Sequence, residues 1–376
     1  MIRFSSPAPV GNELKYITQA IEARGLAGVG TFAKRCEGWL EAQTQAPRVL
    51  LISSCTSGLE LSALLLDVGP GDEVIMPSFT FCSTASAFAL RGAKLVFADI
   101  DPETLCMTAR QVEPLLTPRT KVVVAVHYAG YGGGIDTLAA LCAQRGVRLV
   151  EDAAQALLSF HNGKPLGTFG CLSALSFHDT KNVTGGEGGA LIVNDPKLVE
   201  QAEIVRDKGT DRAQFFRGAV DKYTWQALGS SFVPSELCTA YLLAQLEKAE
   251  EITVRRKAIA QRYRAGLADA TIKAGGSLPS SAHLDASNGH IFWILLRDPD
   301  QQRGFMQHLK TRGIAAVHHY VPLHSAPAGL KYGVAPLPLT VTDDIWCRLV
   351  RLPLHMDLSD ADVDAVIEAG LAFLRA

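Results

Sequence analysis

Seven short apolar runs, each followed by a longer segment with helical spacing, dominate the chain between residues 48 and 195. The runs are continuously apolar, a pattern typical of strands that helices cover on both faces. Because such strands are usually parallel and joined by helices, the pattern predicts an α/β fold with a mostly parallel seven-stranded sheet. The predicted strands lie within residues 48–54, 72–78, 93–101, 121–128, 147–154, 172–179 and 189–195.

A change of pattern after Pro234 predicts a second, smaller domain. Residues 236–267 form a long stretch with apolar residues at helical intervals, which leads out of the first part of the chain. The elements predicted further on are strands over 290–296 and 314–321, a helix over 301–313 and a terminal helix after Ser359. Because 376 residues exceed the size at which a single core stops growing, we expect a large domain over residues 1–245 and a small C-terminal α+β domain over residues 246–376.

The composition narrows the class of protein. The chain is 48% hydrophobic and 20% charged with a formal net charge of -2, which argues against disorder and against a nucleic-acid partner. The eight cysteines form no C-x-x-C pair and the histidines lack metal-binding spacing, so we expect no metal site. The chain opens without an apolar segment and contains no run of about 18 apolar residues, so we expect a cytoplasmic location and no membrane partner.

Two side chains at predicted strand ends are the strongest candidates for chemistry. Lys181 follows the sixth apolar run, and Asp152 closes the fifth beside Glu151. Ligands of parallel sheets collect at the carboxyl ends of the strands. A carboxylate there suits a pyridinium nitrogen, whose protonation makes a pyridoxal phosphate ring an electron sink. The alternatives are a solvated loop lysine and an aspartate that caps a helix over residues 153–158.

A turn rich in hydroxyl groups joins the first apolar run to a predicted helix. Thr56, Ser57 and Gly58 lie there, where free N–H groups and the helix dipole suit a phosphate. Ordinary helix capping without a ligand explains this segment equally well. After the second run, Phe79 and Phe81 each offer a ring that can stack on a flat heteroaromatic group, and each fits the core equally well.

The usual nucleotide-binding fingerprints are missing. No G-x-x-x-x-G-K-[ST] motif occurs, and no G-x-G-x-x-G motif opens a helix after the first run. ATP binding and an NAD-dependent sugar dehydrogenase are therefore disfavoured. The glycine-rich residues 185–189 precede a strand, and we interpret them as a tight turn that lets backbone approach backbone.

Seven segments, in order and over nearly the whole chain, carry a family resemblance. They are SCTSGLEL, DEVIMPSFTFCSTASAF, VFADIDPETL, VHYAG, VEDAAQ, SFHDTKN and GEGGALIVND. Together they resemble the DegT/DnrJ/EryC1/StrS family of nucleotide-sugar aminotransferases. The resemblance implies the fold type I architecture of pyridoxal-phosphate enzymes, with pyridoxal 5'-phosphate as cofactor and pyridoxamine phosphate as an intermediate. It also implies a homodimer with active sites at the subunit interface.

The same resemblance implies roles for single residues. Lys181 matches the Schiff-base lysine, and Asp152 matches the partner of the ring nitrogen. Gln155 matches the residue near the ring hydroxyl, and Phe81 matches the stacking aromatic. The positions that match the family's phosphate contacts are Thr56, Ser57 and Ser176. Some relatives replace the lysine with histidine and are dehydratases, so the retained lysine favours amino transfer.

One segment departs from the family pattern. Many members carry an Asn and an Arg in a G-x-N-x-R segment, where this chain has Gly, Ser, Ser, Phe and Val over residues 229–233. The Asn normally reaches the phosphate of the neighbouring subunit. Ser231 takes its place here, and its shorter side chain weakens the expectation of that contact.

Residues 206–232 further resemble members that act on one particular nucleotide sugar. These transfer an amino group from L-glutamate to C4 of dTDP-4-keto-6-deoxyglucose, giving dTDP-4-amino-4,6-dideoxygalactose, which supplies enterobacterial common antigen, and 2-oxoglutarate. The candidate substrate contacts are Phe215, Arg217 and Lys222, leaning into the partner's site, and His319, Tyr320 and His324 in the small domain. Surface charges or core rings are the alternative for each. Rival functions are amination of a 3-keto or gluco-configured nucleotide sugar and a cofactor-binding regulator or scaffold without turnover.

Overall fold

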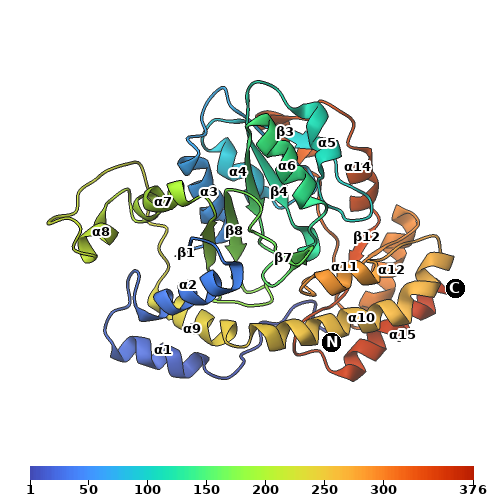
Figure 1. Cartoon of the computed structure of the whole chain (residues 1–376). Helices are drawn as coiled ribbons and strands as arrows, with labels where there is room; N and C mark the ends of the chain where they lie inside the picture. Colours follow the sequence, from blue (N-terminus) through green and yellow to red (C-terminus); the bar gives the residue numbers. More distant parts are fainter.

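All seven predicted strands form, and they lie side by side in one sheet at the centre of the molecule (Figure 1). The computed structural model describes residues 1–376. The strands are β1 (Arg48–Ile52), β2 (Glu73–Pro77), β3 (Lys94–Ala98), β4 (Thr120–Val126), β5 (Arg148–Asp152), β8 (Leu172–Ser176) and β9 (Gly189–Val193). An eighth, β11 (Gly333–Val334), extends the sheet by pairing parallel with β3. The prediction missed it because two residues leave no apolar run.

The sheet is mostly parallel, as expected. Its strand order is β1-β9-β8-β5-β4-β2-β3-β11, and only β9 runs antiparallel to its neighbours β1 and β8. Strands β5 and β8 pair in parallel with Asp152 opposite Ala174. This register brings the carboxyl ends of the two strands to the same edge of the sheet. Asp152 is the last residue of β5, and Lys181 lies in the loop that follows β8.

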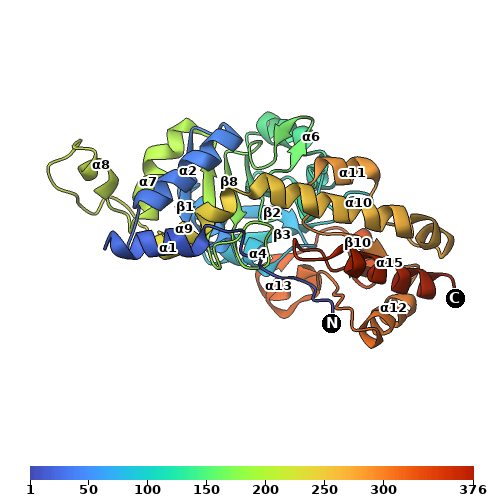
Figure 2. The ribbon, with the colours of Figure 1, turned by 90° about the horizontal axis from the view of Figure 1, so that it is seen from below.

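Helices cover both faces of the sheet, which explains why the strands read as continuous apolar runs. One face packs against α2 (Thr31–Thr44), α6 (Ile135–Arg145) and α9 (Glu236–Leu246). The other packs against α3 (Cys55–Leu65), α4 (Cys82–Ala89) and α7 (Val199–Arg206). Figure 2 shows α1 (Glu13–Glu22) lying along α9. The remaining short elements of this part are α5 (Ala109–Val112), β6 (Phe160–His161), β7 (Lys164–Pro165) and α8 (Arg212–Phe216).

The C-terminal part has a core of its own around α10 (Ala249–Lys273). Its other elements are α11 (Ser281–Ala286), β10 (Trp293–Leu295), α12 (Pro299–Thr311), α13 (Pro327–Tyr332), α14 (Thr340–Trp346), β12 (Leu349–Arg351) and α15 (Asp360–Leu374). The predicted strand over residues 314–321 is wrong. This segment pairs with β12 only through Val317 and Arg351, because β12 is three residues long and its other edge is taken by β10.

Each of the two parts contains a segment from the other end of the chain. The helical stretch breaks at Glu247 and Lys248, beside the expected domain boundary. Ile2 nevertheless pairs with Ile314, so the N-terminus lies with the C-terminal part (Figure 2), while β11 joins the large sheet. None of the helices combines the length and apolar character that crossing a lipid bilayer requires.

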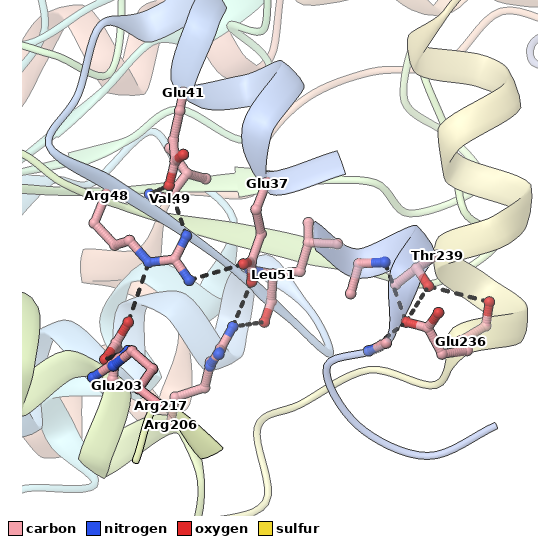
Figure 3. Close-up of polar contacts among 12 residues, drawn as sticks. Glu37, Glu41, Arg48, Val49, Leu51, Glu203, Arg206, Arg217, Glu236 and Thr239 are labelled. Atoms are coloured by element: carbon pink, nitrogen blue, oxygen red, sulfur yellow. Dashed lines mark hydrogen bonds and ion pairs between the residues drawn. The ribbon is translucent and has the colours of Figure 1, made fainter. Parts of the chain in front are cut away.

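A buried network of charges fixes α2, β1 and α7 to one another (Figure 3). Glu37 accepts hydrogen bonds from Arg206 at 2.6 Å, from Arg48 at 3.0 Å and from the backbone N–H of Leu51 at 3.0 Å. Both Glu37 and Arg206 are almost completely enclosed. Removing one partner of such a pair leaves the other charge buried and uncompensated.

We expect Glu37→Ala to lower the free energy of unfolding by roughly 3–5 kcal/mol, because Arg206 loses its only carboxylate. Urea denaturation measures this value. Glu113→Ala is the matched control, since its ion pair with Arg145 is exposed and contributes at most about 1 kcal/mol. Equal losses in the two variants contradict the assignment of a stabilising role to the buried network.

Candidate active site

A cavity of about 540 Å³ opens at the carboxyl edge of the sheet, between the sheet and the C-terminal part. Eight of the predicted site residues line it: Thr56, Phe81, Asp152, Gln155, Ser176, Lys181, His319 and Tyr320. The N-terminal segment contributes Phe4 and Ser5 to its wall. Side chains far apart in the sequence therefore meet around one space of the size that small-molecule sites have.

Lys181 lies in the loop that follows β8, and its side chain reaches the cavity. Its amine makes no hydrogen bond and no ion pair with the protein, and it lies in the cavity wall and not on the outer surface. Burial lowers the pKa of this amine, Asp152 raises it again and the charge of Arg351 lowers it further, with a net value below the usual range. A lowered pKa leaves a larger fraction of the amine unprotonated at pH 7, which is the form that acts as nucleophile or base.

Asp152, the last residue of β5, is 6% exposed. Its Oδ2 accepts a hydrogen bond of 2.7 Å from the hydroxyl of Thr84, and its Oδ1 accepts one of 3.2 Å from the backbone N–H of Ala154. The alternative in which this carboxylate caps a helix is wrong, because residues 153–158 form turns. The aspartate is held in place while one side of it faces the cavity.

The adjacent Glu151 serves a different purpose. It is fully enclosed and accepts hydrogen bonds from His127 Nε2 at 2.7 Å and from the backbone N–H groups of Gly167, Phe169 and Gly170 at 2.8, 2.7 and 2.6 Å. Burial raises the pKa of this carboxyl, but the His127 contact and the backbone donors outweigh burial, so the net pKa lies below 4.5. Glu151 is thus a charged structural group, whereas Asp152 lines the cavity.

The hydroxyl-rich turn lies at the N-terminus of α3, as expected, with Ser54 as the capping residue. The backbone N–H groups of Cys55 and Thr56 have no hydrogen-bond partner, and Thr56 faces the cavity. Ser57 does not line the cavity, since its hydroxyl contacts Ser53 and Ser54 at 2.9 and 3.0 Å. Free N–H groups at a helix N-terminus fit a phosphate.

The glycine-rich turn before β9 provides room next to this helix N-terminus. A Cβ atom on Gly189 would lie 2.5 Å from the carbonyl carbon of Ser54 and 2.6 Å from the backbone nitrogen of Cys55. Only glycine therefore allows the two backbones to approach so closely, as the interpretation of residues 185–189 requires.

Of the two candidate phenylalanines, Phe81 lines the cavity and is 58% exposed. Phe79 is a core residue instead, packed edge-on against Tyr128 and Tyr320 with ring centres 5.0 and 5.5 Å apart. Gln155 is fixed between the backbone N–H of Ala129 at 2.7 Å and the hydroxyl of Tyr320 at 3.0 Å. Phe81 is therefore the ring available for stacking.

Two of the three predicted residues of the small domain reach the cavity. His319 stacks on Tyr320 with ring centres 3.8 Å apart. Burial, with the charges of Arg351 and Lys181, lowers the pKa of His319 to about 2, so its ring is neutral at pH 7. His324 lies outside the cavity lining, where Nδ1 contacts the hydroxyl of Ser78 at 2.8 Å and Nε2 lies 3.4 Å from Asp343.

The remaining predicted contacts lie away from the cavity of this chain. Phe215, Arg217 and Lys222 belong to an exposed segment around α8, which projects from the body of the molecule (Figure 1). Arg217 forms a 2.8 Å ion pair with Glu203. Ser231 is exposed and pairs with Asp207 through its backbone. Within one chain, none of the four reaches the other candidate residues.

Sequence reasoning missed several residues of the cavity wall. Arg256 and Arg351 come from the C-terminal part, and Cys55 lies with its thiol 3.8 Å from Asp152. Thr84, which orients Asp152, was missed as well. Of the two arginines, Arg351 alone has a signal in the sequence, because it is a cation within the apolar residues 349–354. This signal can be interpreted only once the pairing of distant segments is known.

The fold and the cavity together define a pyridoxal-phosphate-dependent aminotransferase of fold type I. The chain belongs to the DegT/DnrJ/EryC1/StrS aminotransferase family, whose family model matches residues 9–370. It is similar over 100% of both chains to the aminotransferase TlmJ from Streptoalloteichus hindustanus, at 35% identity and a TM-score of 0.90.

Two further solved structures show the same likeness. The protein Spr1654 from Streptococcus pneumoniae, in a pyridoxamine phosphate form, is 26% identical over 100% of this chain and 99% of that one, with a TM-score of 0.90. PseC from Helicobacter pylori, an aminotransferase involved in the biosynthesis of pseudoaminic acid, is 25% identical over 100% and 99%, with a TM-score of 0.89. These likenesses agree with the expected fold type and cofactor.

We expect Glu151→Gln to destabilise the protein by roughly 3 kcal/mol or more at pH 7, because an amide cannot accept from all four enclosed donors. The folded-state pKa of Glu151 is lowered, so its charge stabilises the fold at neutral pH, and this contribution is lost as the pH falls through that value. The difference between parent and variant in urea denaturation should therefore shrink below pH 4.5. A difference that does not change with pH contradicts the role of the charge.

Proposed function

We propose that this protein transfers the amino group of L-glutamate to C4 of dTDP-4-keto-6-deoxyglucose, giving dTDP-4-amino-4,6-dideoxygalactose and 2-oxoglutarate. The observation that carries the proposal is the unpaired amine of Lys181, which lines one cavity with the buried carboxylate of Asp152. The choice of sugar rests on the likeness of residues 206–232 to members that act on it. The description of Spr1654 as a sugar aminotransferase also supports a sugar substrate.

The residues present fit pyridoxal phosphate. Lys181 offers a free amine for the aldehyde, Asp152 a carboxylate for the ring nitrogen and Phe81 an exposed ring for stacking. The N–H groups and hydroxyl at the α3 N-terminus, with Ser176, suit its phosphate, and Gln155 suits its ring hydroxyl. When bound, the cofactor supplies an electron sink for the carbon that loses a proton.

In this mechanism Lys181 is the base that removes the proton from the α-carbon of L-glutamate. Its lowered pKa keeps a larger fraction of the amine neutral at pH 7, which favours that role. After 2-oxoglutarate leaves, the same amine returns a proton to C4 of the keto sugar. Two half-reactions that share one base predict ping-pong kinetics.

The proposal includes a homodimer in which the segment around α8 completes the partner's site. The segment around α8 projects from the body of the molecule (Figure 1), and the side chains of Phe215, Arg217 and Lys222 are exposed. Such groups suit the base and the diphosphate of a nucleotide sugar. Ser231 is proposed to face the cofactor phosphate of the partner, and His319, Tyr320 and His324 to lie on the sugar side.

A visible absorption titration of the purified protein with pyridoxal phosphate tests this proposal. We expect a band of the lysine-bound cofactor that bleaches with L-glutamate and returns with dTDP-4-keto-6-deoxyglucose. Lys181→Ala should show no such band and should lower turnover at least about 10³-fold, because it removes both the attachment point and the base.

Each other result changes a defined part of the proposal. No band in the parent protein overturns the cofactor role of Lys181. A band that bleaches with L-glutamate but does not return with this sugar overturns the choice of substrate. A product with the gluco configuration, or amination at C3, seen by NMR, replaces the named product with one of the rival nucleotide sugars.

Mixing two inactive variants tests the shared site. Lys181→Ala lacks the base, and a variant with alanine at Phe215, Arg217 and Lys222 lacks the projecting side chains. If each site takes its lysine from one subunit and its projecting segment from the other, mixed dimers regain up to about a quarter of the parent activity. Light scattering shows whether both variants remain dimers, and dimeric mixtures that stay inactive contradict the arrangement.

A further inference from the structure

Arg351 is a cation in the cavity wall that has no partner of its own. It is the last residue of β12, and it lines the cavity that also contains Lys181. Its side chain makes no hydrogen bond and no ion pair, and its Nε atom is completely enclosed without an acceptor. The ring of Phe4 lies against it, with its centre 4.7 Å from the guanidinium carbon.

Such a group is costly for the fold. Enclosing a charge without a counter-ion destabilises a protein, and buried cations are normally paired. The other enclosed arginines of this chain have acceptors within the protein, since Arg206 contacts the carboxylate of Glu37 at 2.6 Å and Arg256 donates to the carbonyls of Gly289 and His290 at 3.1 and 2.9 Å. Arg351 is the exception, which indicates that its acceptor is a ligand.

The charges around the cavity favour an anion. Lys181, Arg256 and Arg351 line it, while Asp152 is the one enclosed carboxylate and Glu187 is exposed. His290 and His319 add no charge at pH 7, because burial and the nearby cations hold the pKa of both far below the usual range.

The phosphate expected at the α3 N-terminus does not account for Arg351. That helix begins at the sheet edge, whereas Arg351 belongs to β12 in the C-terminal part. Arg351 lines the same cavity as Lys181, and its charge lowers the pKa of that amine. The acceptor of Arg351 is therefore an anionic group near the carbon on which Lys181 acts.

We propose that Arg351 binds the α-carboxylate of the amino donor. This inference rests on the proposed function. In an amino acid the carboxylate is bonded directly to the carbon that loses its proton, whereas the diphosphate of a nucleotide sugar lies across the ring from C4. The planar guanidinium matches a carboxylate with two parallel hydrogen bonds, which also orients the α-hydrogen toward Lys181.

Glutarate, which carries the two carboxylates of glutamate but no amine to react, is the probe. Calorimetry with the holoenzyme should show glutarate binding at least tenfold weaker to Arg351→Gln than to the parent. The KM for L-glutamate should rise at least tenfold, with the KM for the keto sugar unchanged. Arg297→Gln is the control, because it removes an exposed arginine that is paired with Asp298 and keeps parent-like constants.

Stability separates this role from a structural one. Since Arg351 has no protein partner, Arg351→Gln should melt at or above the melting temperature of the parent when no ligand is present. Glutarate should raise the melting temperature of the parent but not that of the variant. Arg351→Lys, which keeps the charge without the planar fork, should recover part of the affinity for glutarate.

Three results overturn the inference. The first is unchanged glutarate binding by Arg351→Gln. The second is a variant that loses affinity for dTDP and not for glutarate, which assigns the cation to the nucleotide sugar. The third is a variant that melts below the parent and binds glutarate normally, which makes Arg351 structural. A parent protein with no band of bound cofactor overturns the proposed function itself and is recognised before any variant is made.

Discussion

The arrangement of the site depends on the hydrogen bonds that the enclosed carboxylate of Glu151 accepts. It joins His127, just after β4, to the loop that leads into β8, and it does so from within β5. Three neighbouring strands are thereby fixed to one another. Asp152 is the next residue of β5 and Lys181 follows the other end of β8, so a group outside the cavity lining holds together the strands that carry the reactive side chains.

The enclosed charged groups of this protein are of two kinds, those with protein partners and those without. Glu151 accepts four hydrogen bonds from protein donors and Glu37 accepts three, and both hold elements together. Lys181 and Arg351 have no protein partner, and both face the cavity. Cations that lack a protein partner and also line a cavity therefore point to where an anionic ligand binds.

The sequence predicts the sheet well because each of its seven long strands is covered on both faces and therefore leaves an apolar run. It misses β11, and it wrongly extends residues 314–321 into a strand, because a pairing of one or two residues depends on what lies beside it. Lys181 and Asp152 are predictable, since both follow apolar runs at the same edge. Arg351 and Thr84 are not predictable. Thr84 matters because it donates to Asp152, and Arg351 because it has no partner, and only the folded chain shows either fact.

The crossing of the chain between its two parts has a consequence for synthesis. Strand β3 ends the sheet of the first 200 residues, and the two residues that pair with its free edge, Gly333 and Val334, come near the end of the chain. An exposed edge of this kind is a template for pairing with other chains. While the chain leaves the ribosome, that edge stays unpaired until residues 333 and 334 have been made, which lengthens the time in which it is open to other chains.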